Sequence, residues 1–180
     1  MSFPRTLLFI LVIALTACDD LNPSGEDKRT PVDTSVIGPG VGQIAPEFSL
    51  FDTESNTVTM SAELAGVDAI VLYFTMWCPV CDSHMSHLRT QVIPNYPNVR
   101  FLIIDFVSGT IEASRTAQEN NGYTDLTVLV DNAQYVTGLY NGNMGITVVI
   151  DNDGGQGTIL MNEDYKDSVK LTQTLDSLPL

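Results

Sequence analysis

The sequence predicts an α/β fold in which helices flank a central mixed β-sheet. Short apolar runs typical of buried strands alternate with helical segments through the middle of the chain. A hairpin followed by a helix closes it, and this combination requires both parallel and antiparallel pairing. With 180 residues and a 44% hydrophobic content, the chain suits one such domain and a short appendage.

The domain is expected to begin at Gly42 with an N-terminal extension of two short strands. These strands are predicted at 47–51 and 57–60, and the segment SAEL at 61–64 predicts one helical turn. The run AIVLYF at 69–74 is apolar throughout, as in a strand that is covered on both faces.

The second half of the domain begins with a helix at 80–93. Apolar residues recur on one face of this helix, namely Cys81, Met85, Leu88 and Val92. The remaining elements are strands at 99–106 and 126–130, helices at 110–121 and 133–140, a hairpin of strands 146–150 and 157–161, and a final helix at 164–177. The turn DNDG at 151–154 closes the hairpin.

An export signal is predicted at the N-terminus. Arg5 supplies a positive charge, and residues 7–15 form an apolar run far shorter than the roughly 20 residues that cross a bilayer. The ending Leu15-Thr16-Ala17-Cys18 resembles the lipobox of bacterial lipoproteins, which implies that Cys18 is acylated and becomes the mature N-terminus. The alternative is an ordinary cleaved signal, which would leave an unpaired thiol in an oxidising compartment.

Three segments follow from this interpretation. Residues 1–17 form the signal peptide, and residues 18–41 form the lipidated cysteine and a flexible tether rich in Asp, Pro, Gly and Ser. Residues 42–180 form the folded domain. Asp19 resembles the signal that keeps some lipoproteins in the inner membrane, so we expect the domain to be anchored there and to face the periplasm of a bacterium.

The chain is acidic, with 8 Lys and Arg against 22 Asp and Glu and a formal net charge of −14. Such a surface repels nucleic acid and anionic lipid headgroups. The acidic residues are spread rather than consecutive, which is typical of a solvated, exported surface. We therefore expect no nucleic-acid partner, and membrane contact through the lipid on Cys18.

The cysteine pair of Trp77-Cys78-Pro79-Val80-Cys81 is the candidate catalytic site. Cys78 falls where a strand ends and a helix begins, so unpaired N–H groups and the positive end of the helix dipole stabilise its thiolate. Pro79 suits the first helical position, where its missing N–H costs nothing. We expect Cys78 to attack a disulfide, and the less exposed Cys81 to resolve the mixed disulfide by attacking Cys78.

His84 lies at the margin of the apolar helical face, one turn beyond Cys81. An imidazole there could accept the proton that the buried thiol loses. A purely structural role for a partly exposed histidine is the alternative. His87 lies nearly opposite the apolar face and is expected to be a solvated surface residue.

The region around the two cysteines resembles the active site of thioredoxin-like proteins. The segment GQIAPEFSL at 42–50 is similar to the opening of their redoxin branch, which includes membrane-anchored periplasmic thiol-disulfide oxidoreductases, and VVIDNDG at 148–154 is similar to that family's penultimate strand and turn. The resemblance covers residues 42–178. It implies a thioredoxin-like fold and an enzyme that reduces disulfides of protein clients outside the cytoplasm, with an unidentified electron donor, no cofactor and no metal.

Three positions depart from that family's pattern. The buried acid that thioredoxin places six positions before the first cysteine is Leu72 here, and the Glu of many anchored reductases is His84. The cis-proline opposite the cysteines is replaced by Gly145, with Met144 before it. A non-proline cis bond costs about 2.5 to 4 kcal/mol, so we expect this loop to be strained or locally different. Met144 then either faces the sulfurs or fills a packing gap.

Peroxide reduction is a second functional hypothesis. Thr75 and Cys78 match the Thr-x-x-Cys spacing of peroxiredoxins, a family of thiol peroxidases. Those proteins also need a proline four residues before the Thr, where this chain has Val71.

Copper binding or delivery is a third hypothesis and belongs to a different functional class. The four side chains that would make a soft ligand set suited to Cu(I) are Cys78, Cys81, His84 and Met144. This hypothesis requires the imidazole of His84 to point toward the two sulfurs.

Overall fold

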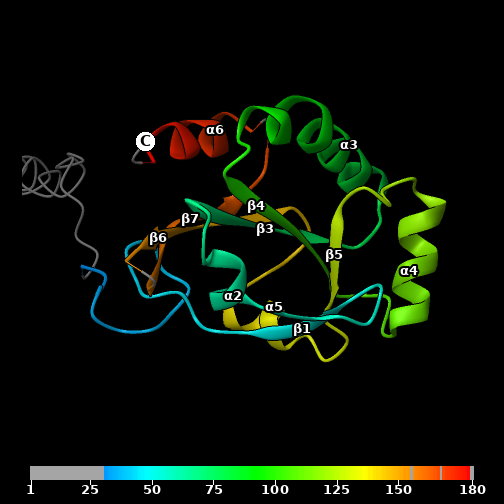
Figure 1. The fold of residues 1–180 in the computed structure, drawn as a ribbon, viewed down its shortest axis with the longest axis horizontal. Helices are drawn as coiled ribbons and strands as arrows, with labels where there is room; N and C mark the ends of the chain where they lie inside the picture. Colours follow the sequence, from blue (N-terminus) through cyan, green and yellow to red (C-terminus); the bar gives the residue numbers. More distant parts are fainter. Residues whose placement is uncertain (1–30, 155, 167, 179–180) are drawn as a thin grey trace, which may run out of the picture. The chain divides into compact units, whose positions relative to one another are not determined.

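The computed structural model describes residues 31–154, 156–166 and 168–178 (Figure 1). The predicted signal peptide, the acylation of Cys18 and most of the tether lie outside the described residues. Residues 32–180 form one compact unit. Within the described ranges, no helix is both long enough and apolar enough to span a membrane.

The strands of the described residues form one mixed sheet in the order β2-β1-β5-β4-β3-β6-β7. Strand β3 pairs in parallel with β4 and antiparallel with β6, and β1 pairs antiparallel with β5. The strands are β1 (Ser49–Asp52), β2 (Thr57–Thr59), β3 (Ala69–Thr75), β4 (Val99–Asp105), β5 (Thr127–Val130), β6 (Ile146–Asp153) and β7 (Gln156–Asp164). The prediction of a mixed sheet with an N-terminal strand extension is confirmed.

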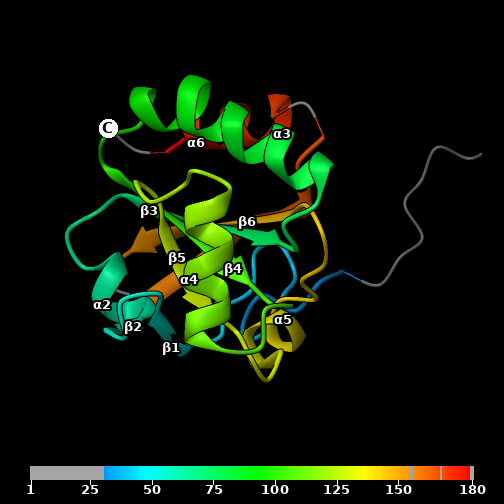
Figure 2. The same ribbon diagram turned by 90° about the vertical axis from the view of Figure 1, so that its right-hand side faces the viewer.

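Helices cover both faces of this sheet. In Figures 1 and 2, α3 and α6 lie over one face and α2 and α5 over the other, while α4 lies beside β5. The helices are α2 (Met60–Leu64), α3 (Pro79–His87), α4 (Ile111–Asn120), α5 (Tyr135–Leu139) and α6 (Val169–Asp176).

Strand β3 carries the chain to the cysteines through the middle of the core. All its residues are buried, and their side chains alternate between two apolar layers. Those at odd positions from 69 to 73 pack with α3 and α6, and those at even positions from 70 to 74 pack with α2 and α5. Leu72, which occupies the position of the thioredoxin acid, therefore faces away from α3, and Tyr73 faces toward it.

The helix predicted at 80–93 is shorter than expected. After α3 the chain continues as a wide π-helical turn, η2 (Leu88–Val92), and a 3₁₀ turn, η3 (Ile93–Asn95). Pro94 lies within η3, and because proline has no N–H it cannot extend the helical hydrogen-bond ladder. The predicted apolar face is nevertheless buried along its whole length, from Cys81 to Val92.

The closing hairpin is longer than predicted. Strand β6 runs to Asp153 and β7 runs to Asp164, so the final helix begins at Val169 instead of residue 164. The polar side chains that predicted a turn at 151–154 bind neighbouring backbone instead. Asp151 accepts a hydrogen bond from the N–H of Thr158 at 2.9 Å, and the Asn152 amide donates to the carbonyl of Leu64 at 2.9 Å.

The last ten residues of the predicted tether belong to the folded unit, which begins at Val32 rather than Gly42. The N–H of Gly42 donates to the carbonyl of Ile159 at 2.7 Å, and Ile37 bridges to Ile44, which in turn bridges to Thr158 in β7. Composition alone predicted a tether here because Pro and Gly are frequent. In the fold this stretch is held by hydrogen bonds instead, since the N–H of Gly38 donates to the carbonyl of Ile44 at 3.0 Å and the Asn162 amide in β7 donates to the carbonyl of Pro39 at 2.9 Å.

Candidate active site

Cys78 occupies the junction between strand β3 and helix α3. It is the N-cap residue of α3, with extended φ and ψ angles of −88° and 164°, and Pro79 takes the first helical position as predicted. The Sγ atom of Cys78 accepts a hydrogen bond from the backbone N–H of Cys81 at 3.2 Å. The sulfur thus caps the helix by pairing with an N–H group that has no partner inside it.

Cys81 lies directly behind Cys78. Its side chain is 0% exposed, whereas Cys78 is partly exposed, and the two Sγ atoms are 2.8 Å apart. Burial raises the pKa of the Cys81 thiol, but hydrogen bonds with Cys78, with the backbone of Met76 and with Thr75 outweigh it, so that the net shift is downward. One sulfur is thus within reach of a substrate, and the other is within reach only of its partner.

Trp77 holds the turn between strand and helix in an unusual backbone conformation, with a φ of +58°. Its backbone N–H donates to Oγ1 of Thr75 at 3.2 Å, and its indole Nε1 donates to Oδ2 of Asp105 at 2.8 Å. Asp105 is 1% exposed and also accepts hydrogen bonds from Ser114 and from the N–H groups of residues 107 and 108. Asp105 was not among the predicted site residues, although an acid at the end of an apolar strand is itself a signal of a buried polar partner.

His84 faces the hydroxyl group of Tyr73 instead of the sulfur atoms. Its Nδ1 atom lies 3.1 Å from the Tyr73 hydroxyl, and the imidazole ring is tilted against Tyr165 with 4.7 Å between ring centroids. The neighbouring Cys81 side chain also acts on the Tyr73 hydroxyl and raises its pKa, after the larger effect of burial. Tyr73 therefore lies beside both His84 and Cys81. It was not predicted as a site residue, because in the sequence it is one more position of an apolar strand.

The loop at Gly145 differs locally from the expected cis-proline loop. No peptide bond among the described residues is cis, and Gly145 adopts a φ of +81°, which favours glycine. Its N–H donates to the carbonyl of Phe74 at 3.0 Å, and a Cβ at this position would lie 3.6 Å from Nδ1 of His84. The residues that replace the family's proline and glutamate are thus neighbours.

Met144 faces the cysteines, with its Sδ atom 3.4 Å from Sγ of Cys78. His84 does not join Met144 and the two cysteines in a ligand set. Within the described part of the chain, no three His, Cys, Asp or Glu side chains are grouped so that they could hold a metal ion. The copper hypothesis required His84 to point toward the sulfurs, and the imidazole is bound to Tyr73 instead.

His87 is exposed, as predicted, but it is not purely solvated. Its Nδ1 atom lies 2.8 Å from the hydroxyl of Tyr165, whose ring also contacts His84. Two histidines one turn apart on α3 therefore meet the same tyrosine.

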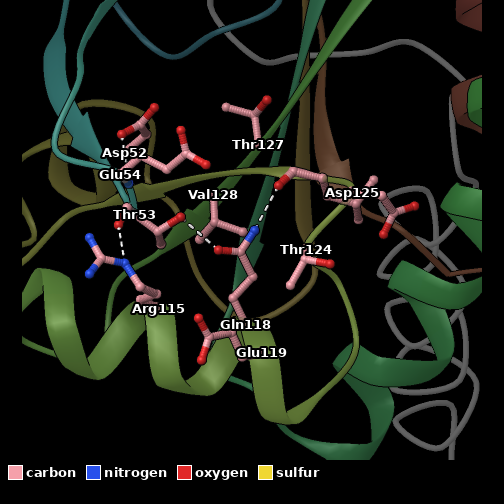
Figure 3. A pocket seen from close by; sticks show the side chains of 11 residues that line it. Asp52, Thr53, Glu54, Arg115, Gln118, Glu119, Thr124, Asp125, Thr127 and Val128 are labelled. Atoms are coloured by element: carbon pink, nitrogen blue, oxygen red, sulfur yellow. Dashed lines mark hydrogen bonds between the residues drawn. The ribbon is translucent and has the colours of Figure 1, made fainter.

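A polar cleft elsewhere on the domain is a structural feature rather than part of this site. It lies between α4 and the end of β1, and Figure 3 shows the side chains that line it. Gln118 accepts a hydrogen bond from Thr53 at 2.6 Å and donates to the carbonyl of Leu126 at 2.8 Å, and Arg115 donates to the carbonyl of Thr53 at 2.7 Å. These internal bonds pair the side chains of Thr53 and Gln118 and the Nε–H of Arg115 within the protein.

Comparison with known proteins identifies related sequences and folds. The amino-acid sequence matches the profile described as the AhpC/TSA family over residues 41–155. No curated protein matches the chain.

Solved structures share the architecture. A candidate protein disulfide isomerase from Bacteroides thetaiotaomicron is 21% identical, with a TM-score of 0.64 over 80% of this chain and 94% of that one. Peroxidoxin BcpB from Mycobacterium tuberculosis is 18% identical, with a TM-score of 0.61 over 78% and 98%. A secreted disulfide oxidoreductase, also from Mycobacterium tuberculosis, is 22% identical, with a TM-score of 0.55 over 73% and 96%. These similarities confirm the thioredoxin-like fold.

Proposed function

The chain belongs to the AhpC/TSA family, and from that premise we propose that it is a thiol-disulfide oxidoreductase with Cys78 and Cys81 as its redox pair. One observation carries the proposal. A reachable sulfur that accepts a backbone N–H lies 2.8 Å from a second sulfur that is completely buried. The predicted membership of the redoxins is confirmed, and the roles of the two cysteines are our proposal.

The reaction follows from the unequal exposure of the two sulfurs. The thiolate of Cys78 attacks one sulfur of a substrate disulfide, which forms a mixed disulfide and releases the first substrate thiolate. Cys81 then loses its proton and attacks Sγ of Cys78, which releases the second substrate thiolate and leaves a Cys78–Cys81 disulfide. The substrate has gained two electrons, and an external dithiol donor must return two electrons to the pair.

Protein disulfides are the substrate class that the surface favours. Large apolar side chains are exposed on both sides of Cys78 in the sequence and across from it, namely Met76, Val80 and Met144. Such exposed apolar side chains around a reactive group suit the unfolded or flexible segments of a protein client better than a small polar disulfide. The electron donor is a further protein dithiol that would meet the same surface.

The test uses the full chain carrying Cys18→Ser, in mild detergent, so that Cys78 and Cys81 are its only thiols. We expect this protein to catalyse reduction of insulin by a dithiol, and we expect both Cys78→Ser and Cys81→Ser to abolish turnover. The protein with Cys18→Ser alone is the matched control, since both test variants also carry Cys18→Ser and differ from it only at Cys78 or Cys81. Full turnover in the Cys81→Ser variant would contradict the two-cysteine mechanism.

The reductive direction is tested by the reduction potential of the pair. Dithiols that act as reductants have potentials of about −270 mV, and strong oxidants have potentials of about −120 mV. We expect equilibration of the protein with defined thiol buffers to give a value closer to the first. A value near the second would assign the enzyme to disulfide formation.

Peroxide reduction is the second candidate, and the family match is the observation that favours it. Thr75 has the peroxiredoxin spacing, but its hydroxyl accepts a hydrogen bond from the N–H of Trp77 and also contacts Cys81. We therefore expect peroxide to be consumed more slowly than a protein disulfide is reduced. Peroxide turnover that exceeds insulin reduction would reverse the assignment, and tight Cu(I) retention that is lost in His84→Ala would favour the copper hypothesis.

Anchoring outside the cytoplasm through Cys18 completes the proposal. Expression of the natural chain in a bacterium with labelled palmitate should label the protein, and Cys18→Ser should abolish the label. Fractionation of the membranes tests the inner-membrane assignment, which rests on Asp19. Recovery of the labelled protein in the outer membrane would contradict that assignment.

A further inference from the structure

The second step of the proposed reaction needs a route for a proton. Cys81 must lose its proton before it can attack Cys78, yet its side chain is 0% exposed, so water cannot take the proton directly. The acid that serves thioredoxin-like proteins at this point is absent, because Leu72 occupies its position and faces the opposite core layer.

We propose that the hydroxyl group of Tyr73 carries the proton of Cys81 to Nδ1 of His84, and this inference rests on the proposed function. The Tyr73 hydroxyl lies 3.1 Å from Nδ1 of His84, and it is close enough to the Cys81 side chain for that group to raise its pKa. Tyr73 is 1% exposed and lies on the side of β3 that faces α3, so this hydroxyl bridges the two groups inside the protein.

The transfer is written as one concerted step. The S–H bond of Cys81 breaks as an O–H bond forms on Tyr73, while the original O–H bond of Tyr73 breaks and an N–H bond forms at Nδ1 of His84. The electron pair left on the Cys81 sulfur attacks Sγ of Cys78, and the substrate sulfur leaves as a thiolate. His84, which is partly exposed, then returns its proton to water.

Tyr73 is suited to pass a proton but not to hold a negative charge. Burial raises the pKa of its hydroxyl far above the usual value, and the neighbouring charges at Cys81 and Cys78 raise it further. The hydroxyl therefore does not ionise at any physiological pH, and it can accept the proton of Cys81 only as it gives up its own.

His84 is suited to be the terminal acceptor. Burial lowers the pKa of its imidazole, the carboxylate of Asp164 in β7 opposes this shift, and His87 on the same helix adds to it. The other groups that face the ring are the neutral hydroxyl of Tyr73 and the ring of Tyr165. The relay requires the neutral ring to carry its hydrogen on Nε2, so that Nδ1 can accept from the Tyr73 hydroxyl 3.1 Å away.

The experiment separates the two chemical steps with 5,5′-dithiobis(2-nitrobenzoate) in single-turnover mixing. The first release of thionitrobenzoate reports attack by Cys78, and the second reports resolution by Cys81. All proteins are the reduced full chain with Cys18→Ser in mild detergent. The variants are Tyr73→Phe, which removes the hydroxyl, and His84→Gln, which can still accept a hydrogen bond from Tyr73 but cannot take a proton.

The matched control is Tyr123→Phe. Tyr123 is also a buried tyrosine of the layer under α3, and its hydroxyl donates to Asp82 on that helix. The Tyr123→Phe substitution removes a hydroxyl from the same packing layer, and this hydroxyl bonds to neither sulfur.

We expect Tyr73→Phe and His84→Gln to leave the first release unchanged and to slow the second by roughly 100-fold, the lower end of what a positioned proton acceptor contributes. In the unsubstituted protein the second rate should fall as the pH drops through the pKa of His84, and His84→Gln should remove this dependence. Tyr123→Phe should leave both rates unchanged.

Other outcomes would refute the relay or the proposed function separately. A second release at the original rate in Tyr73→Phe or His84→Gln would refute the relay and leave the redox pair intact. Equal slowing in Tyr123→Phe would also refute it, since packing would then explain the effect. The absence of a second release in the unsubstituted protein would refute the two-cysteine function itself.

Discussion

The indole Nε1 of Trp77 donates a hydrogen bond to Oδ2 of Asp105, 2.8 Å away. This contact ties the turn that carries Cys78 to the end of the neighbouring strand, because Thr75 and Asp105 are direct partners in the pairing of β3 with β4. The left-handed backbone of Trp77, with a φ of +58°, is thereby held by a buried carboxylate rather than by the turn alone.

Asp105→Asn should destabilise the domain and change the environment of Trp77. The amide of Asn has only one acceptor oxygen, and its NH₂ group would face N–H and O–H donors that the carboxylate now accepts from. Hydrogen bonds to a charged group, worth about 1.5 to 3 kcal/mol, are therefore lost. Urea unfolding measures the loss, and because Trp77 is the only tryptophan of the chain, its fluorescence reports the turn directly. Asp125→Asn is the control, since its exposed ion pair with Arg89 should contribute less than about 1 kcal/mol.

Gly145→Ala should destabilise the domain by about 1 to 2 kcal/mol, the cost of a left-handed backbone for a residue with a Cβ. The added methyl group would meet His84 at 3.6 Å, an ordinary contact, so steric overlap adds nothing. Gly138→Ala is the control, because that glycine lies in α5 with open space around it and alanine favours a helix by about 0.5 to 1 kcal/mol. Equal unfolding free energies for Gly145→Ala and the natural chain would show that residue 145 does not adopt the left-handed backbone given by its φ of +81°.

The stability of the domain should rise with pH on the acid side of neutrality, partly because of His84. Burial lowers the pKa of its imidazole below the ordinary value of about 6.5. Between the folded and the unfolded pKa, the unfolded chain therefore binds more protons than the folded one. The contribution is fully present above the unfolded pKa and is lost as the pH falls through the folded pKa.

Urea unfolding between about pH 5 and 7.5 checks this dependence. His84→Gln should flatten the rise, and His87→Gln, a histidine on the exposed side of the same helix, should keep most of it. An unchanged slope in His84→Gln would mean that burial does not shift this imidazole.

Gln118→Ala should cost about 2 to 4 kcal/mol of unfolding free energy without changing the thiol chemistry. It leaves the buried hydroxyl of Thr53 and the carbonyls of Tyr123 and Leu126 without the bonds that Gln118 supplies. Glu119→Ala, an exposed neighbour on the same cleft, should stay within about 0.5 kcal/mol. Lost insulin reduction in folded Gln118→Ala would show that the cleft takes part in function.

Most of the fold could be predicted from patterns of residues that are close together in the sequence. The apolar run before Cys78, the proline after it and the apolar helical face beyond it are neighbours in the chain, so their periods and caps could be read directly. Boundaries failed where a tertiary partner intervened. Asp151 and Asn152 resemble turn residues, yet they lie in β6 because Thr158 and the backbone near α2 satisfy their side chains.

The candidate site divides in the same way. The position of Cys78 and Cys81 one helical turn apart at the start of α3 could be predicted from the sequence, because an N-cap and its first turn are local geometry. The contact of Trp77 with Asp105 and the place of Tyr73 beside His84 and Cys81 follow only from the packing of the folded chain. Those contacts depend on the register of paired strands and on how α3 lies over the sheet, which no stretch of sequence specifies alone.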